Sequence, residues 1–161
     1  MGAEEVDPEK RERDCEARAL RLLGRREHSR SELWHKLARR EPEPSVVDRV
    51  LDHLEAQGWL SDERFAEIYA RQRLDAGFGP LRIRAELEQR GVSSTPAALE
   101  GVDETTWCRM ALKQRRQRFG LSGDLDWKEK GRQGRFLAQR GFSMSQIERA
   151  LGASDTDEEL D

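Results

Sequence analysis

The chain has 161 residues, of which 38% are charged and 35% hydrophobic, and its formal net charge is −3. This length suits one domain or a row of small repeats, and the near-zero net charge argues against disorder. No apolar run approaches the ~20 residues of a membrane span, and the N-terminus lacks a signal-peptide pattern, so we expect a cytoplasmic protein with no membrane contact.

Helical periodicity predicts three helices in residues 14–60. The first should begin at about Cys15, where apolar residues start to recur every three to four positions. Ser29 followed by Glu32 is a capping-box pattern for the second helix, and the prolines of "EPEP" should end that helix. Ser45 should open the third.

The same pattern then starts twice more. Ser61 is placed to cap a helix, Pro80 fits the first position of the next, and a short helix should follow "SSTP". A third round begins near Thr106, and Ser143 is placed to cap the last helix. No useful length of chain alternates apolar and polar residues at period two, so the prediction is an all-α protein.

A period of fifty residues relates the three rounds. Leu37, Leu87 and Leu137 share this spacing, and an arginine follows each of them three residues later. Such periodicity is typical of a repeat array, in which one unit is too small to bury its own apolar face. We therefore predict an elongated, curved array of three tandem three-helix repeats. We expect a charged flexible N-terminal tail at residues 1–13 and an acidic C-terminal tail at residues 152–161. The three repeats should occupy residues 14–60, 61–106 and 107–151.

Charge is distributed unevenly along the chain. Residues 107–151 hold 11 Lys or Arg against four Asp or Glu, which gives +7, whereas residues 14–60 balance to zero. Residues 152–161 carry five acids and no base. A basic segment beside an acidic tail indicates a polyanion or an acidic protein as partner, with a tail that competes for the same surface. The alternative is that the tail is a solvated, frayed terminus.

The candidate binding residues are cations of the second and third repeats. Arginine forks match phosphate and carboxylate groups, and a basic stripe along an array would follow a nucleic-acid backbone. The run "KQRRQRFG" contains no acid, which favours binding, whereas a solvated helix face is an equal alternative for Arg82 and Arg84. Phe78 and Trp59 are candidates for base stacking, although Trp59 is better placed to seal a repeat junction. The full set is Arg71, Arg73, Arg82, Arg84, Arg90, Lys113, Arg115, Arg116, Arg118, Lys128, Lys130, Arg132, Arg135 and Arg140.

No pattern of catalytic or metal-ligating residues is present. The sequence lacks a P-loop, a dinucleotide-binding glycine motif and a nucleophile elbow, and its three histidines have no companion ligands at usable spacing. Cys15 and Cys108 lie on predicted apolar helix faces without metal-ligand spacing. We therefore expect a protein that is not an enzyme and that uses no metal and no cofactor.

Residues 58–92, "GWLSDERFAEIYARQRLDAGFGPLRIRAELEQRGV", resemble the central block of the RecX regulatory proteins of bacteria. The segments "LRLLGRREHSRSELWHKL" before this block and "FLAQRGFSMSQIERAL" after it are also similar to that family. The resemblance covers roughly residues 14–151. The chain departs from the family pattern at the missing glycine after Leu37 and in its two charged tails.

The resemblance implies a non-catalytic regulator that binds the RecA recombinase and its filament on single-stranded DNA, lying in the helical groove of the filament. Such a protein would inhibit filament extension and lower ATP hydrolysis, strand exchange and co-protease activity, thereby regulating recombination, DNA repair and the SOS response. Some members also bind DNA directly. We expect a monomer. The alternatives are a stand-alone helical nucleic-acid-binding module and a helical scaffold for an unrelated partner.

Overall fold

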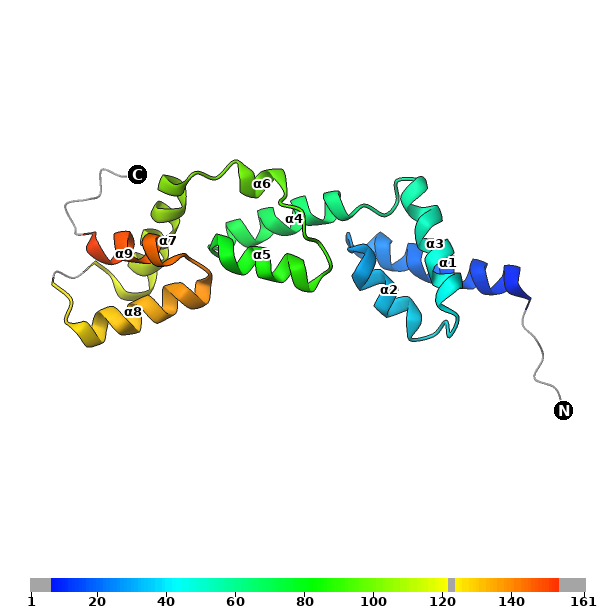
Figure 1. Ribbon diagram of the computed structural model, residues 1–161, viewed down its shortest axis with the longest axis horizontal. Coiled ribbons are helices and arrows are strands. Elements are labelled where there is room, and N and C mark those ends of the chain that lie inside the picture. Colours follow the sequence, from blue (N-terminus) through cyan, green and yellow to red (C-terminus); the bar gives the residue numbers. More distant parts are fainter. Residues whose placement is uncertain (1–6, 122–123, 154–161) are drawn as a thin grey trace. The chain divides into compact units, whose positions relative to one another are not determined.

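The computed structural model describes residues 7–121 and 124–153, and within them it contains nine helices and no strand (Figure 1). This confirms the predicted all-α class. The parts of the predicted tails at residues 1–6 and 154–161 lie outside the described residues. The helices are α1 (Pro8–Arg25), α2 (Arg30–Ala38), α3 (Pro44–Ala56), α4 (Asp62–Asp75), α5 (Pro80–Gln89), α6 (Ala97–Glu100), α7 (Glu104–Phe119), α8 (Trp127–Arg140) and α9 (Met144–Gly152).

α1 begins earlier than the sequence pattern predicted, so residues 8–13 belong to a helix and the assignment of all thirteen residues to a flexible tail was wrong. The Asp7 side chain caps the helix by accepting a hydrogen bond from a backbone amide at 3.1 Å. Pro8 occupies the first helical position, where its missing N–H has no partner to lose. Arg11 forms an ion pair with Glu41, and this tertiary contact helps to hold the polar first turns.

Three of the serine caps predicted from the sequence are confirmed, but the prediction that Ser45 opens the third helix was wrong, because α3 begins at Pro44 with Glu43 as its N-cap. Ser29, Ser61 and Ser143 each accept a hydrogen bond from the backbone amide three residues on, which satisfies one of the free donors at a helix start. At Ser143 the Gln146 side chain also accepts from the serine amide and completes a capping box. At Ser29 the Glu32 carboxylate instead forms an ion pair with an arginine after α1.

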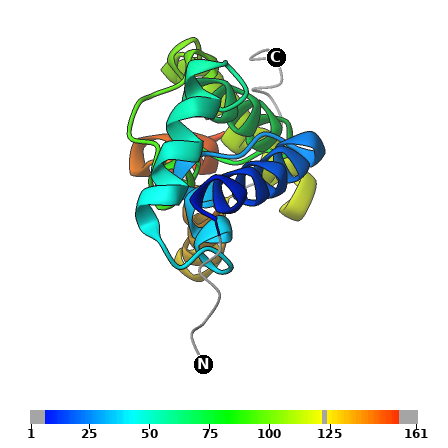
Figure 2. The same ribbon diagram turned by 90° about the vertical axis from the view of Figure 1, so that its right-hand side faces the viewer.

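The chain forms two compact units, Met1–Ile68 with Gln89–Ser94, and Tyr69–Glu88 with Thr95–Asp161. In the first unit α1, α2 and α3 pack around one apolar core, and Figure 2 shows α1 in dark blue in front of this domain. Leu22, Leu23 and Trp34 pack against the core at its edge. The core residues are Cys15, Ala19, Leu33, Leu37, Val46, Val47, Val50, Leu51, Leu54 and Leu60.

In the second unit α7, α8 and α9 pack together in the same way. Cys108 is buried there, as Cys15 is in the first unit, which confirms that both cysteines are buried hydrophobic positions. The three equivalent leucines, Leu37, Leu87 and Leu137, are 1%, 2% and 0% exposed. The fifty-residue period therefore marks one buried position that recurs in each three-helix domain. The elongated, curved form of the array stays a prediction.

A Gln-Arg-Gly turn joins two domains within the second unit. The backbone amides of Gly79 and Leu81, at the start of α5, donate to the carbonyl oxygens of Arg140 and Gly141 at 2.8 and 2.9 Å. Free carbonyls at the end of α8 thus satisfy free amides at the start of α5, and the two helix dipoles meet with opposite ends together. Gly141 has a φ of +101°, and a Cβ there would lie 2.3 Å from the Cβ of Arg82.

The equivalent turn after α5 makes a similar joint within the first unit. Ser29 donates from Oγ to the carbonyl oxygen of Arg90 at 2.6 Å, while the same hydroxyl caps α2. Gly91 has a φ of +78°, and a Cβ there would lie 2.6 Å from the Cβ of Ser31. The Gln-Arg-Gly sequence recurs because each copy must place a turn against the start of another domain's helix.

Candidate functional site

Three of the predicted arginines gather around Phe78 in the second unit. The guanidinium carbons of Arg73, Arg140 and Arg82 lie 3.8, 3.9 and 4.4 Å from the centre of the Phe78 ring. These residues come from α4, α8 and α5, so the cluster ties the second three-helix domain to the third. Cation–π attraction of this kind strengthens when it is partly desolvated. The ring is occupied by these contacts, so it does not fit the predicted role in base stacking.

Glu86 is the carboxylate of this cluster. It accepts hydrogen bonds from Arg73 and Arg82 at 2.7 and 3.0 Å and a further one from the Tyr69 hydroxyl. Burial raises the pKa of Glu86, but these three donors outweigh burial and lower it to about 2. Burial and the charges of Arg82 and Arg73 lower the pKa of Arg140, whose guanidinium donates to the Ala76 carbonyl oxygen. The cluster therefore serves the joint between domains.

Arg90 belongs to the other joint, with its Nε 3.8 Å from a Glu32 carboxylate oxygen. Arg71 and Arg84 are exposed on α4 and α5. The predicted set thus contains four arginines that hold joints and two that face solvent in this part of the chain. Trp59 is 59% exposed, so the prediction that it seals a repeat junction was wrong.

The structure corrects the prediction for Arg115, which is 1% exposed and lies inside the third domain. Its guanidinium donates to the Gln133 side-chain oxygen at 2.8 Å and to the carbonyl oxygens of Ala150 and Ala153 at 2.9 and 3.1 Å. A side chain with these buried contacts cannot also bind a partner. The signal was available in the sequence, because Arg115 follows Ala111 and Leu112 at the spacing of one helix face.

Its neighbours on α7 differ from it. Lys113 and Arg118 are exposed, whereas Arg116 is half-buried. The Arg118 guanidinium lies 5.4 Å from the centre of the Phe136 ring, which fixes its position beside α8. Two exposed cations thus remain of the four predicted in "KQRRQRFG".

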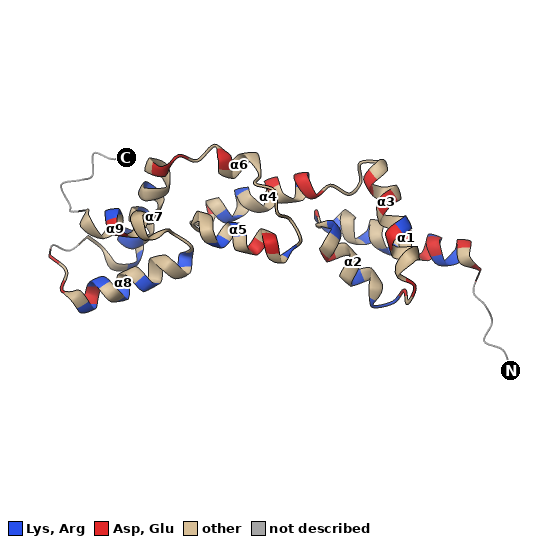
Figure 3. Ribbon diagram, viewed as in Figure 1, with Lys and Arg blue, Asp and Glu red and all other residues tan. Residues whose placement is uncertain are grey.

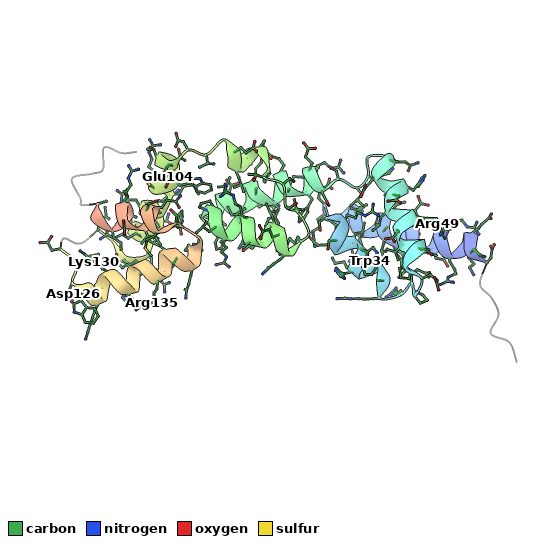
Figure 4. The ribbon with its side chains drawn as sticks, in the orientation of Figure 1. Trp34, Arg49, Glu104, Asp126, Lys130 and Arg135 are labelled. Atoms are coloured by element: carbon green, nitrogen blue, oxygen red, sulfur yellow. The ribbon has the colours of Figure 1, made fainter. Side chains whose placement is uncertain are left out.

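Among the binding residues predicted from the sequence, the cations of α8 form the most accessible basic stripe. Lys128, Lys130, Arg132 and Arg135 are all exposed, and Figure 3 shows the basic residues of α8 in blue. Lys130 and Arg135 are labelled along this helix in Figure 4. Arg132 forms an ion pair with Glu129 at 2.7 Å. The other three cations form no ion pair within residues 7–121 and 124–153, and they remain available to an anionic partner.

Trp127, the first residue of α8, is 79% exposed, and the Lys128 ammonium lies 5.8 Å from the centre of its ring. An exposed aromatic beside a basic stripe can stack on a base while the cations contact phosphate. The hollow at this end of α8 is also lined by Asp124 and Asp126, which weakens its attraction for anions.

A second basic surface, not predicted from the sequence, lies in the first domain. A groove of ≈ 370 Å³ runs between α1 and the end of α2. The zero net charge of residues 14–60 concealed it, because the carboxylates of this segment point to other faces. Its lining consists of Arg18, Arg21, Leu22, Arg25, Lys36, Leu37, Arg39 and Arg40.

Comparison with protein families identifies all three domains. Models of the first, second and third three-helix domains of RecX match residues 15–54, 61–97 and 108–151. The chain belongs to the RecX family.

Curated relatives agree with this assignment. The chain is 46% identical over 143 residues to the regulatory protein RecX of Halorhodospira halophila, with 88% of each chain covered. It is 40% identical over 149 residues to that of Pseudomonas fluorescens strain SBW25, with 87% of this chain and 91% of the relative covered. A regulatory role follows for this RecX family member.

Solved structures show the same fold. The crystal structure of RecX from Lactobacillus salivarius matches with a TM-score of 0.74 at 19% identity, over 88% of this chain and 95% of that one. A further crystal structure of a regulatory protein RecX matches with a TM-score of 0.74 at 22% identity, over 92% of this chain and 79% of that one. Across residues 7–121 and 124–153, no helix is long and apolar enough to span a membrane, and no acid, His or Cys cluster could hold a metal.

Proposed function

We propose that this RecX family member is a non-catalytic modulator that binds the RecA recombinase and its filament on single-stranded DNA. The observation that carries the proposal is the match of all three domains to RecX models, together with relatives that are named regulatory proteins. The three domains would lie in the helical groove of the filament. There they would block filament extension and so lower ATP hydrolysis, strand exchange and co-protease activity.

The exposed stripe of α8 supports an anionic partner. Lys128, Lys130 and Arg135 project from one helix without ion pairs within the described residues, so a phosphate or carboxylate can approach them without first breaking an internal contact. Arginine and lysine at such positions gain both charge attraction and hydrogen bonds from phosphate oxygens. The stripe would contact DNA phosphate or an acidic surface of RecA.

The test is a titration of RecA ATPase activity on single-stranded DNA. The wild-type chain should suppress ATP hydrolysis at less than one molecule per RecA, and no suppression at an equimolar ratio would overturn the proposal. Replacing Lys128, Lys130 and Arg135 with alanine should shift the inhibition curve to higher protein concentration. Lys10→Ala with Arg13→Ala, at exposed positions of α1, is the control and should leave the curve unchanged.

A stand-alone nucleic-acid-binding module is the second candidate, and the exposed Trp127 beside the basic stripe favours it. This function predicts tight, steeply salt-dependent binding to bare DNA, with no additional affinity for RecA-coated DNA. Comparing the affinities for bare DNA and for preformed filaments separates the two candidates. Stronger binding to filaments supports the RecA proposal.

A further inference from the structure

The α1–α2 groove is lined almost entirely by cations. Arg18, Arg21 and Arg25 lie on one face of α1, and Lys36, Arg39 and Arg40 come from the last turn of α2 and the residues after it. The two other lining residues are leucines, and no acid lines the groove. The three arginines of α1 follow the helix axis over about 10 Å at 1.5 Å per residue. The lining therefore offers a row of positive charge instead of a single point.

Most other arginines of this domain are paired with carboxylates. Arg26 contacts Glu32, Arg30 contacts two acids of α3, and Arg49 of α3 contacts Glu12 of α1. In contrast, none of the six groove cations forms an ion pair within residues 7–121 and 124–153. The groove thus gathers six cations without a direct ion pair in the described part of the domain, although Glu41 and Glu32 lie near enough to act on Arg18 and Lys36.

α1 sorts its charges between two sides. The carboxylates of Glu12 and Glu16 point to α3, where they meet Arg49 and His53. Arg18, Arg21 and Arg25 of the same helix line the groove beside the end of α2. A solvated helix face normally mixes acids and bases at three- and four-residue spacing, which lets them pair along the helix. On this face of α1 only Asp14, four residues before Arg18, is placed to pair in this way, and it forms no ion pair within residues 7–121 and 124–153.

Lys36 is fixed in place at the edge of this groove. The His28 ring donates from Nδ1 to the Arg26 carbonyl oxygen at 3.0 Å, which leaves Nε2 to accept a hydrogen bond from the Lys36 ammonium at 3.0 Å. Burial lowers the pKa of Lys36, the charges of Arg26 and Arg39 lower it further, and the Glu32 carboxylate opposes these effects only in part. Mutual repulsion of this kind is relieved when an anion binds among the cations.

The end of α2 that forms one wall of the groove is equivalent to the turns that join domains elsewhere. Arg40 occupies the position of Arg90 and Arg140, but it is exposed and makes no such joint within the described residues. Glu41 takes the place of the joint glycine, and it is buried and paired with Arg11. The first domain therefore leaves this turn open to a ligand.

We infer that the α1–α2 groove binds the phosphate backbone of a nucleic-acid strand. Five arginines and one lysine suit phosphate, because each guanidinium presents two parallel N–H donors to its oxygens. No aromatic residue lines the groove, so it has no surface for base stacking. Of the two apolar residues in the lining, Leu37 is buried in the domain core and Leu22 packs against its edge, so the groove offers little apolar surface to anchor an acidic peptide.

This site would deepen the proposed function by giving the first domain its own contact with the DNA strand of a RecA filament. It can be measured without RecA, so its failure would leave the RecA proposal standing. Failure of the RecA titration would in turn leave the groove measurement valid. The two ideas are thereby separable.

The experiment measures binding of the full chain to a fluorescent single-stranded oligonucleotide by anisotropy, between 50 and 200 mM salt, roughly the range over which phosphate contacts lose most affinity. The test variant replaces Arg21, Arg25 and Arg39 with alanine, because all three are exposed and none contributes to the core. It should bind about tenfold more weakly at low salt, and the slope of log affinity against log salt should fall by about 2, or ~0.7 for each lost contact.

The control replaces Lys10, Arg13 and Arg109, which are also exposed cations, and it should bind like the wild type. Circular dichroism should show that both triple variants keep their helices. Equal affinity and an unchanged salt slope in the test variant would overturn the inference. The inference would also be overturned if a labelled peptide of residues 152–161 bound the wild type and not the test variant, while both bound DNA equally. The occupant would then be an acidic polypeptide.

Discussion

Replacing Arg115 with methionine should destabilise the third domain and leave its outer surface unchanged. Methionine fills much of the same volume but removes the donors to Gln133, Ala150 and Ala153. Hydrogen bonds from a charged donor contribute about 1.5–3 kcal/mol each, and a buried acceptor left without a partner costs about 1–3 kcal/mol. The variant regains the free energy that was needed to bury the guanidinium, so the net loss should be about 3 kcal/mol.

Hydrogen exchange is the appropriate assay, because a chain of two compact units need not unfold in one transition. Exchange resolved by peptide should show that protection falls about 100-fold for the amides of α7 and α9, since 1.4 kcal/mol corresponds to a factor of ten. Peptides from α1–α3 should keep their protection. Arg118→Met on the same helix is the matched control, because Arg118 is exposed.

The result that would refute this reasoning is a variant with normal protection and lost affinity for DNA or RecA. Arg115 would then be a contact residue, as the acid-free run "KQRRQRFG" indicated. Normal binding after correction for the unfolded fraction would support the structural role.

Three further changes test other parts of the structure. Gly141→Ala should lower the free energy of unfolding of the second unit by about 2 kcal/mol or more, as measured by urea titration, because its φ of +101° and the approach of Arg82 both exclude a Cβ. Gly24→Ala is the control, because a Cβ there meets nothing within 4 Å, and it should be neutral or stabilising. Leu137→Ala should cost about 2–5 kcal/mol through the cavity it leaves, and hydrogen exchange of α7–α9 reports it. Burial lowers the pKa of His28 below 6.5, so the unfolded chain takes up a proton first and the free energy of unfolding of the first unit should fall as the pH drops below 6.5. Urea titrations at several pH values give the free energy of unfolding as a function of pH. This free energy should depend less on pH in His28→Gln than in the wild type. His35→Gln, which alters an exposed ring, is the control and should keep the wild-type pH dependence.

Helical periodicity and cap chemistry were enough to predict much of the fold. Ser61 and Pro80 were placed correctly, because a serine hydroxyl and a proline ring act on the residues next to them in the chain. The start of α1 was missed for the opposite reason. Its first turns have no apolar stripe, and two of their side chains are held by Glu41 and Arg49, partners about thirty residues or more away.

The candidate site was harder to predict than the fold, since charge alone does not tell whether an arginine binds a ligand, a ring or a buried carbonyl, and only helical spacing marked Arg115 as inward-facing. Arg115 is an internal anchor, and Arg73 and Arg140 hold a joint around Phe78. Net charge over a window was equally misleading. It pointed to residues 107–151, while the basic groove of the first domain lay in a segment whose charges cancel in number but not in position.

The missing glycine after Leu37 follows from the same geometry that requires glycine elsewhere. Gly91 and Gly141 lie where another helix start approaches within 2.6 and 2.3 Å of a would-be Cβ. The equivalent turn in the first domain meets no helix start within the described residues, so a side chain is permitted there. Glu41 uses that freedom to hold Arg11 and the first turns of α1. The departure from the family pattern thus stabilises α1, one wall of the proposed phosphate groove, while the exposed Arg39 and Arg40 form part of the other.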